Sequence, residues 1–120
     1  MKPTPRLVAL VFIGGALGTW SRWLVAESFN TLDMLIIVNL LGSALLGYVN
    51  TSKSFESDLH KAFWAVGFCG GFTTMSGVAL WNFSMFSPFS LAMVLFMMLT
   101  GIIAYRVAVK LENSRNKWKP

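Results

Sequence analysis

The sequence contains few charged residues. Asp, Glu, Lys and Arg make up 12% of its 120 residues, whereas 55% are hydrophobic. A soluble domain carries about 25% charged residues, and a chain of this length would lack the polar side chains to cover its surface in water. Disordered chains are poor in apolar residues, and a large multi-domain enzyme would be longer, so both are excluded. The composition therefore predicts a small integral membrane protein.

Residue types that carry chemistry are also scarce. The chain has one cysteine, Cys69, and one histidine, His60, which excludes an intrachain disulfide and a His/Cys metal cluster. The only acidic residue within the apolar segments is Asp33, at an edge, whereas proton-coupled exchange normally uses a titratable group inside the membrane. No nucleophile–base pair or phosphate loop is recognisable. We therefore expect no enzymatic activity.

Four apolar segments are long enough to cross a membrane, which takes about 20 helical residues. The stretch 62–105 has no charged residue and would be about 66 Å long as one helix, roughly twice the hydrocarbon thickness, so it must fold back. The reversal is expected at 84–88, because Pro88 suits the first turn of the following helix. We expect a single domain over residues 1–120, a polar tail that frays from Glu112 onward, and spans at 7–26, 32–50, 62–82 and 88–109.

Basic residues are distributed unevenly between the two sides of these spans. Of the ten Lys and Arg residues, only Arg22 lies toward the side of the first and third loops. The others flank the termini and the loop between the second and third spans: Lys2, Arg6, Lys53, Lys61, Arg106, Lys110, Arg115, Lys117 and Lys119. This bias predicts a cell-membrane protein with both termini in the cytoplasm. A cleaved signal peptide is the alternative for the N-terminal span, but Trp20 and Trp23 replace the small residues of a cleavage site.

Two polar side chains lie inside the first two spans. Asn39 is near the middle of the second span, where an amide without a partner costs several kcal/mol. It either forms an interhelical hydrogen bond or lines a polar path, in which its NH₂ group donates to an anion. Arg22 lies about 22 Å along the first span. It snorkels outward, caps a carbonyl, or attracts anions at a vestibule.

The third span contains the strongest local signal. Two adjacent glycines, Gly70 and Gly71, precede the hydroxyl side chains of Thr73, Thr74 and Ser76. Each glycine costs about 1 kcal/mol in a helix, so we expect the helix to open here. Open backbone at membrane depth must face protein or a cavity, where freed carbonyls can coordinate a cation and hydroxyls can donate to an anion. The alternative is packing alone, which small residues at four-residue spacing favour: Gly14 and Gly18, Ser43 and Gly47, Gly67 and Gly71.

Three blocks, taken in order, resemble the Fluc (CrcB) family of fluoride channels. Residues 14–23 are similar to its GGxxGAxxRY opening, 38–42 to its VNxxG block, and 67–74 to its GFCGGxTT core. With the length and the four spans, the resemblance covers essentially the whole chain. It implies an all-α membrane protein whose third helix is broken at mid-membrane. It also implies a dimer of antiparallel, inverted subunits with two pores, which releases fluoride from the cytoplasm down its gradient.

The resemblance also implies roles for individual residues. The backbone oxygens of Gly70 and Thr73 would bind a structural Na⁺ at the dimer centre, in keeping with the preference of hard cations for oxygen. The fluoride path would be lined by a set of polar residues: Asn39, Thr74, Ser76 and, near a vestibule, Arg22.

The chain departs from the family in the pore segment. The family continues TTFSTF, whereas this chain has Met75 and Val78 at the two phenylalanine positions of the path and Gly77 in place of a threonine. A phenylalanine edge is electropositive and can face an anion, but methionine and valine have no such edge. The charge bias also fixes one orientation, whereas pairing with an inverted copy requires little bias. We therefore hypothesise a heterodimer with an oppositely inserted paralogue that supplies the phenylalanines; a homodimer is the alternative.

Two other functions remain open. A non-conducting regulatory or structural subunit of a fluoride channel would be consistent with the missing phenylalanines. A small multidrug exporter is also short and has four spans, but its proton–drug exchange requires a membrane-embedded glutamate in the first span. The nearest one here, Glu27, lies at the outer end.

Overall fold

The computed structural model describes residues 2–117, and the regular structure in this part of the chain is helical throughout. Four helical runs are long and apolar enough to cross a membrane, and the third is the composite segment Asp58–Met85. The all-helical, four-span architecture expected from the sequence is therefore confirmed. The elements in chain order are α1 (Pro5–Ser28), α2 (Thr31–Thr51), the 3₁₀ turn η1 (Lys53–Phe55), α3 (Asp58–His60), the π-helix η2 (Lys61–Cys69), α4 (Gly70–Phe72), α5 (Met75–Met85) and α6 (Pro88–Lys117).

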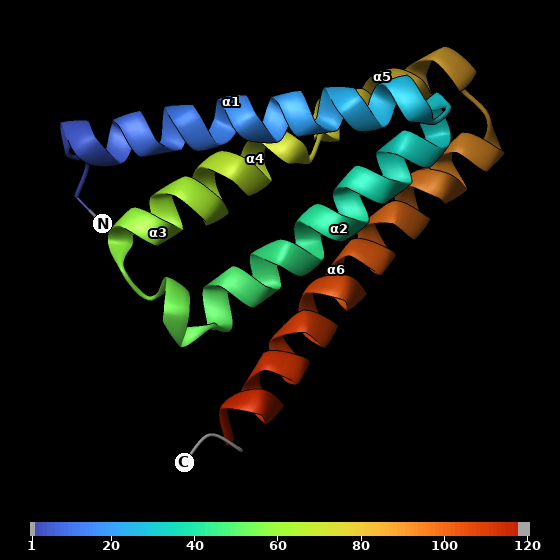
Figure 1. Cartoon of the computed structure of the whole chain (residues 1–120). Coiled ribbons are helices and arrows are strands. Elements are labelled where there is room, and N and C mark those ends of the chain that lie inside the picture. Colours follow the sequence, from blue (N-terminus) through green and yellow to red (C-terminus); the bar gives the residue numbers. More distant parts are fainter. Residues whose placement is uncertain (1, 118–120) are drawn as a thin grey trace.

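The long helices form two pairs, and the two helices of each pair run in the same direction (Figure 1). α1 packs along η2 and α4, and α2 packs along α6. The N-terminus, the loop after α2 and the C-terminal end of α6 lie toward one side of Figure 1, whereas the turns after α1 and α5 lie toward the other. Four crossings therefore place both chain ends on one side of the molecule, together with the loop that carries Lys53 and Lys61.

Short polar side chains fix where the helices begin. Asn30 Oδ1 accepts a hydrogen bond from the Asp33 backbone N–H at 3.0 Å, which satisfies one free donor of the first turn of α2. At the start of α6, the hydroxyls of Ser87 and Ser90 each accept from the other's backbone N–H at 3.1 Å. This reciprocal cap places the reversal between α5 and α6 within the expected segment 84–88.

Glycines allow the first helix pair to approach at backbone distance. A Cβ atom at Gly18 would overlap the carbonyl of Phe68, and one at Gly71 would overlap the carbonyl of Gly15. A Cβ atom at Gly67 would lie 2.7 Å from the Val11 carbonyl oxygen. Small residues at helix contacts permit such packing in lipid, where burial of apolar surface gives no drive for helix association. The small-residue pairs recognised in the sequence therefore do serve helix packing.

The C-terminal helix is longer than the sequence suggests. Glu112 is only 4% exposed and lies 3.0 Å from Arg115, whose guanidinium also donates to the Tyr48 hydroxyl at 3.3 Å. These contacts hold the end of α6 against α2, so the tail expected to fray from Glu112 is helical to the end of α6. Residues 118–120, which include Lys119, lie outside the described residues.

The glycine contacts give a matched test of packing. We expect Gly18→Ala to lower the free energy of unfolding by about 1–3 kcal/mol, because its Cβ meets the Phe68 backbone. Gly15→Ala is the control on the same helix, since its Cβ would make an ordinary 3.8 Å contact with the Gly67 carbonyl oxygen. This control should be neutral or stabilising by up to about 1 kcal/mol. Unfolding in detergent measures both, and equal losses would contradict the packing role.

Candidate ion site at the helix break

Two residues in extended conformation interrupt the third span. Thr73 has φ −75° and ψ 157°, and Thr74 has φ −147° and ψ 108°, so α4 ends at Phe72 and α5 begins at Met75. The sequence predicted that the helix opens at Gly70 and Gly71, which is wrong by three residues, because the extended residues are Thr73 and Thr74. Gly70 is helical, with φ −63° and ψ −37°, and so is the rest of α4.

Only one of the two glycines serves helix contact. Gly71 packs against the backbone of Gly15, and a Cβ atom there would not fit. Gly70 differs, since a Cβ atom there would have nothing within 4 Å, and its position is exposed. Gly70 therefore presents its backbone to open space immediately before the break.

Side chains from two other helices bind the backbone of the break. Arg22 of α1 donates from Nη1 to the Thr73 carbonyl oxygen at 3.1 Å. Asn39 of α2 accepts from the Thr74 N–H at 2.9 Å and donates to the Thr74 carbonyl at 3.3 Å. Peptide groups outside a helix need such partners at membrane depth, because lipid supplies none. Of the roles left open for Arg22, the structure shows a carbonyl cap, and Asn39 forms an interhelical hydrogen bond.

The Thr74 and Ser76 hydroxyls lie at the start of α5. Thr74 Oγ1 accepts from the Gly77 N–H at 3.0 Å and so caps α5, and it lies 3.3 Å from the Ser76 hydroxyl. The Thr73 hydroxyl instead donates to the Cys69 carbonyl at 2.9 Å, within the preceding helix. Of these three hydroxyls, two therefore gather at the N-terminus of α5.

The break brings opposite ends of two helices together. Because the Thr74 N–H bonds to Asn39, the Gly70 carbonyl loses the partner that a continuing helix would give it. On the other side, the first N–H groups of α5 have no partner within their own helix. Carbonyls at a C-terminal end favour a cation, and N–H groups at an N-terminal end favour an anion. The geometry can therefore serve ions of both signs within a short distance.

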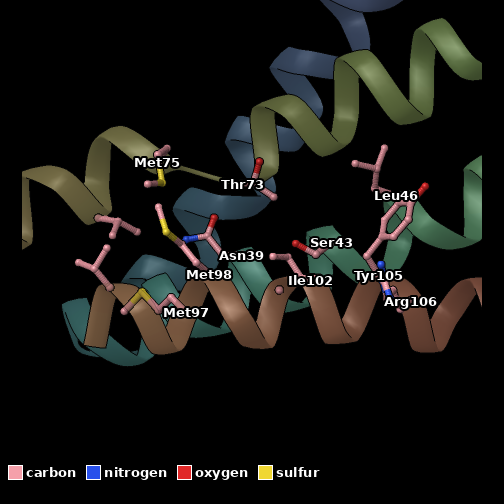
Figure 2. Close-up of a pocket in the computed structure, with 13 residues that line it drawn as sticks. Asn39, Ser43, Leu46, Thr73, Met75, Met97, Met98, Ile102, Tyr105 and Arg106 are labelled. Carbon is pink, nitrogen blue, oxygen red and sulfur yellow. The ribbon is translucent and has the colours of Figure 1, made fainter. Parts of the chain in front are cut away.

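A groove of about 410 Å³ leads away from the break between α2, α5 and α6 (Figure 2). Four residues predicted for the site line this groove, namely Asn39, Thr73, Met75 and Val78. Met75 is 57% exposed, whereas Val78 is 2% exposed and packs with Leu35 and Met97 in a buried cluster.

Other lining residues were not recognised as site residues from the sequence. Ser43 lies one helical turn after Asn39, and that four-residue spacing could have indicated a shared polar face of α2. At the far end, the groove is lined by Tyr105 and Arg106, of which the sequence indicated only Arg106, as a charge that sets orientation.

Comparison with known proteins identifies the family of this chain. The family profile described as "CrcB-like protein, Camphor Resistance (CrcB)" matches residues 9–111. The chain belongs to this CrcB family. A relative from Methanosarcina mazei, named "Fluoride-specific ion channel FluC 2", is 35% identical over 114 residues, with 90% of each chain covered. One from Chlorobium luteolum, named "Fluoride-specific ion channel FluC", is 34% identical over 119 residues, covering 83% of this chain and 92% of the relative.

A third relative is more similar over a shorter region. "Fluoride-specific ion channel FluC 1" of Rhodococcus jostii is 41% identical over 73 residues, which is 61% of this chain and 58% of that protein. The family assignment made from three sequence blocks is therefore confirmed.

The three blocks that indicated the CrcB family meet at the break. Block 14–23 provides Arg22, block 38–42 provides Asn39, and block 67–74 contains the interrupted backbone. Gly42, in the second block, allows contact with the Thr73 side chain, since a Cβ atom there would overlap it. The blocks thus describe one structural unit.

Asn39 provides a test of this unit. We expect Asn39→Leu to expose the Thr74 amide, because it leaves the Thr74 N–H and carbonyl without partners, at about 1–3 kcal/mol for each group. Hydrogen–deuterium exchange of peptides that contain Thr74 should accelerate, and stability in detergent should fall. Asn50→Leu is the matched control, since Asn50 is an exposed residue of the same helix whose one side-chain hydrogen bond, to the Tyr105 hydroxyl, is long at 3.4 Å; it should cost at most about 0.5–1 kcal/mol and leave exchange at Thr74 unchanged. Unchanged exchange at Thr74 in the Asn39 variant would contradict the clamp.

Proposed function

We propose that the chain is a subunit of a fluoride-selective channel that releases fluoride from the cytoplasm down its gradient. The observation that supports this most is the break, where side chains from α1 and α2 hold an opened backbone in the middle of a membrane span. Its relatives are named fluoride-specific ion channels rather than enzymes. The proposal accounts for polar groups that would otherwise be costly at this depth.

In this proposal, fluoride follows the groove beside the break. Asn39 lines the groove and uses one N–H of its amide on Thr74, which leaves its second N–H for an anion. Thr74 and Ser76 add hydroxyls at the N-terminus of α5, where the helix dipole favours negative charge. Arg22, held at the break, adds a positive charge.

We also propose that a structural Na⁺ binds at the break with help from a partner chain. The Gly70 carbonyl fits this role, because it is freed by the Asn39 bond and belongs to an exposed residue. The Thr73 carbonyl fits less well, since it already accepts from the cationic Arg22 and has one lone pair left. Two oxygens from one chain do not complete the shell of a hard cation, which takes several oxygen ligands. A second subunit would supply the rest.

The partner in this proposal is a paralogue inserted in the opposite orientation. Nine of the ten basic residues flank one side of the spans, which favours one orientation for this chain. At the two positions where the family has phenylalanine, this chain presents an exposed Met75 and a buried Val78. A pair of identical chains would therefore offer the anion no aromatic edge there. From the same bias we propose that both termini lie in the cytoplasm and that the chain resides in the cell membrane.

A second candidate function is a non-conducting subunit. The observation in its favour is Val78, which borders the groove but is 2% exposed and packs in the chain's own core. In that case the paralogue would carry the fluoride path, and this chain would only complete the fold of the complex.

Flux from reconstituted liposomes tests these functions. We expect little fluoride efflux from the chain alone and fluoride-selective efflux, measured against chloride, when it is reconstituted with its paralogue. Restoring phenylalanine in the chain by Met75→Phe and Val78→Phe tests the second candidate, since a change in flux places these residues in a conducting path. Robust fluoride flux from the chain alone would contradict the heterodimer. Absence of fluoride flux both from the chain alone and from the mixed complex would contradict the channel function.

Sodium removal tests the cation. We expect replacement of Na⁺ by a large organic cation to lower the Tm of the assembled complex, because an ion bound only by the folded state stabilises it by about 2.7 kcal/mol at 100 times its Kd. The shift should be reversed by Na⁺ in a concentration-dependent manner. A Tm that is the same with and without Na⁺ would contradict this part of the proposal.

A further inference from the structure

A second hollow borders the groove beside the break. The first runs from Asn39 and Thr73 to Tyr105 and Arg106, and the second, of about 560 Å³, begins at the same Tyr105 and Arg106. The second hollow follows α6 to Lys117. The two hollows share Tyr105 and Arg106, and together they follow α6 from the helix break to Lys117; we call them the depression along α6.

Cations follow this second hollow on one face of α6. Arg106, Lys110 and Lys117 all line it and are exposed. Within residues 2–117, the only salt bridge joins Glu112 to Arg115, and these two residues line a different hollow, toward α2. The face along the depression thus carries three positive charges and no acidic residue among its lining side chains.

Polar groups continue the path between these cations and the break. The Tyr105 hydroxyl accepts from Asn50 at 3.4 Å, which leaves its own hydrogen free to donate. Ser43 and Asn39 follow on α2 and line the same groove (Figure 2). An anion that enters at the end of α6 therefore meets positive charges first and hydrogen-bond donors next.

We infer that Arg106, Lys110 and Lys117 form a basic ramp that gathers anions from water and delivers them to the groove. The inference rests on the proposed fluoride channel and adds an entry route to it. A cleft lined by charges of one sign, with low-dielectric walls, concentrates counter-ions and raises their rate of entry. Because these charges are exposed, their effect must weaken as salt screens them.

An anionic lipid headgroup is the other ligand that these three basic residues could bind. The length of the row from Arg106 to Lys117 favours the ramp. Eleven residues separate Arg106 from Lys117, which corresponds to about 16 Å along a helix. The polar layer of a bilayer is only about 5–7 Å thick on each side. A stripe of this length extends beyond the headgroups into water, where a small anion is collected.

The test compares two double variants with equal loss of charge, in whichever complex conducts. Arg106→Gln with Lys110→Gln removes two ramp charges, and Lys2→Gln with Arg6→Gln removes two charges at the N-terminus, outside both hollows. One charge about 10 Å from a monovalent anion in water changes its local concentration about twofold. We therefore expect the ramp variant to lower initial fluoride efflux about fourfold at ~10 mM ionic strength. The difference should vanish at ~1 M, where the screening length is about 3 Å.

The measurement uses vesicles of neutral lipid alone and vesicles with anionic lipid. The ramp requires a deficit in neutral vesicles, no comparable deficit in the N-terminal variant, and normal efflux in Arg106→Lys. A deficit that occurs only with anionic lipid identifies a lipid site and overturns the ramp, as does a deficit that high salt leaves unchanged. Normal parental flux with an unaffected ramp variant overturns the ramp alone. Absent parental flux overturns the proposed function on which it rests.

Discussion

A peptide group that leaves a helix inside a membrane must find its hydrogen-bond partner within the protein. Three such groups at Thr73 and Thr74 are bound by Arg22 and Asn39, one residue from each of the first two long helices. This requirement explains why a cation and an amide occur inside otherwise apolar spans. It also explains why the third span can change direction without exposing its backbone to lipid.

The clamp depends on how closely the helices approach. Gly18, which lies four residues before Arg22 on α1, brings this helix against the backbone at Phe68. Gly42 gives the Thr73 side chain room against α2, one turn from Asn39. A methyl group at either glycine would separate the helices that carry the clamping side chains. Close helix packing and the hydrogen bonding of the opened backbone therefore depend on each other here. The sequence alone left packing and function as alternatives for these motifs, but the two do not exclude each other.

The sequence predicted the four-span class, the position of the last reversal and the residues that meet at the break. It misplaced the break itself, because helix propensity treats Gly70 and Gly71 as weak positions, whereas Gly71 is fixed in the helix by its contact with Gly15. The role of Arg22 stayed open, since no local pattern shows that its partner is the carbonyl of Thr73, 51 residues away. The extension of α6 depends on Glu112, Arg115 and Tyr48, which only the pairing of α2 with α6 brings together.

Under the proposed function, one chain provides only part of an ion site at the break. Its carbonyl end offers Gly70 freely but shares Thr73 with a guanidinium, so the cation face is incomplete within the chain. Its amide end carries donors from Thr74 and Asn39, yet the two following family positions hold methionine and valine, which cannot contribute to an anion's shell. In the proposed complex, a partner that supplies oxygens on one side and aromatic edges on the other would complete both faces at once. The proposed single orientation of this chain is the reason for proposing that this partner is a different protein.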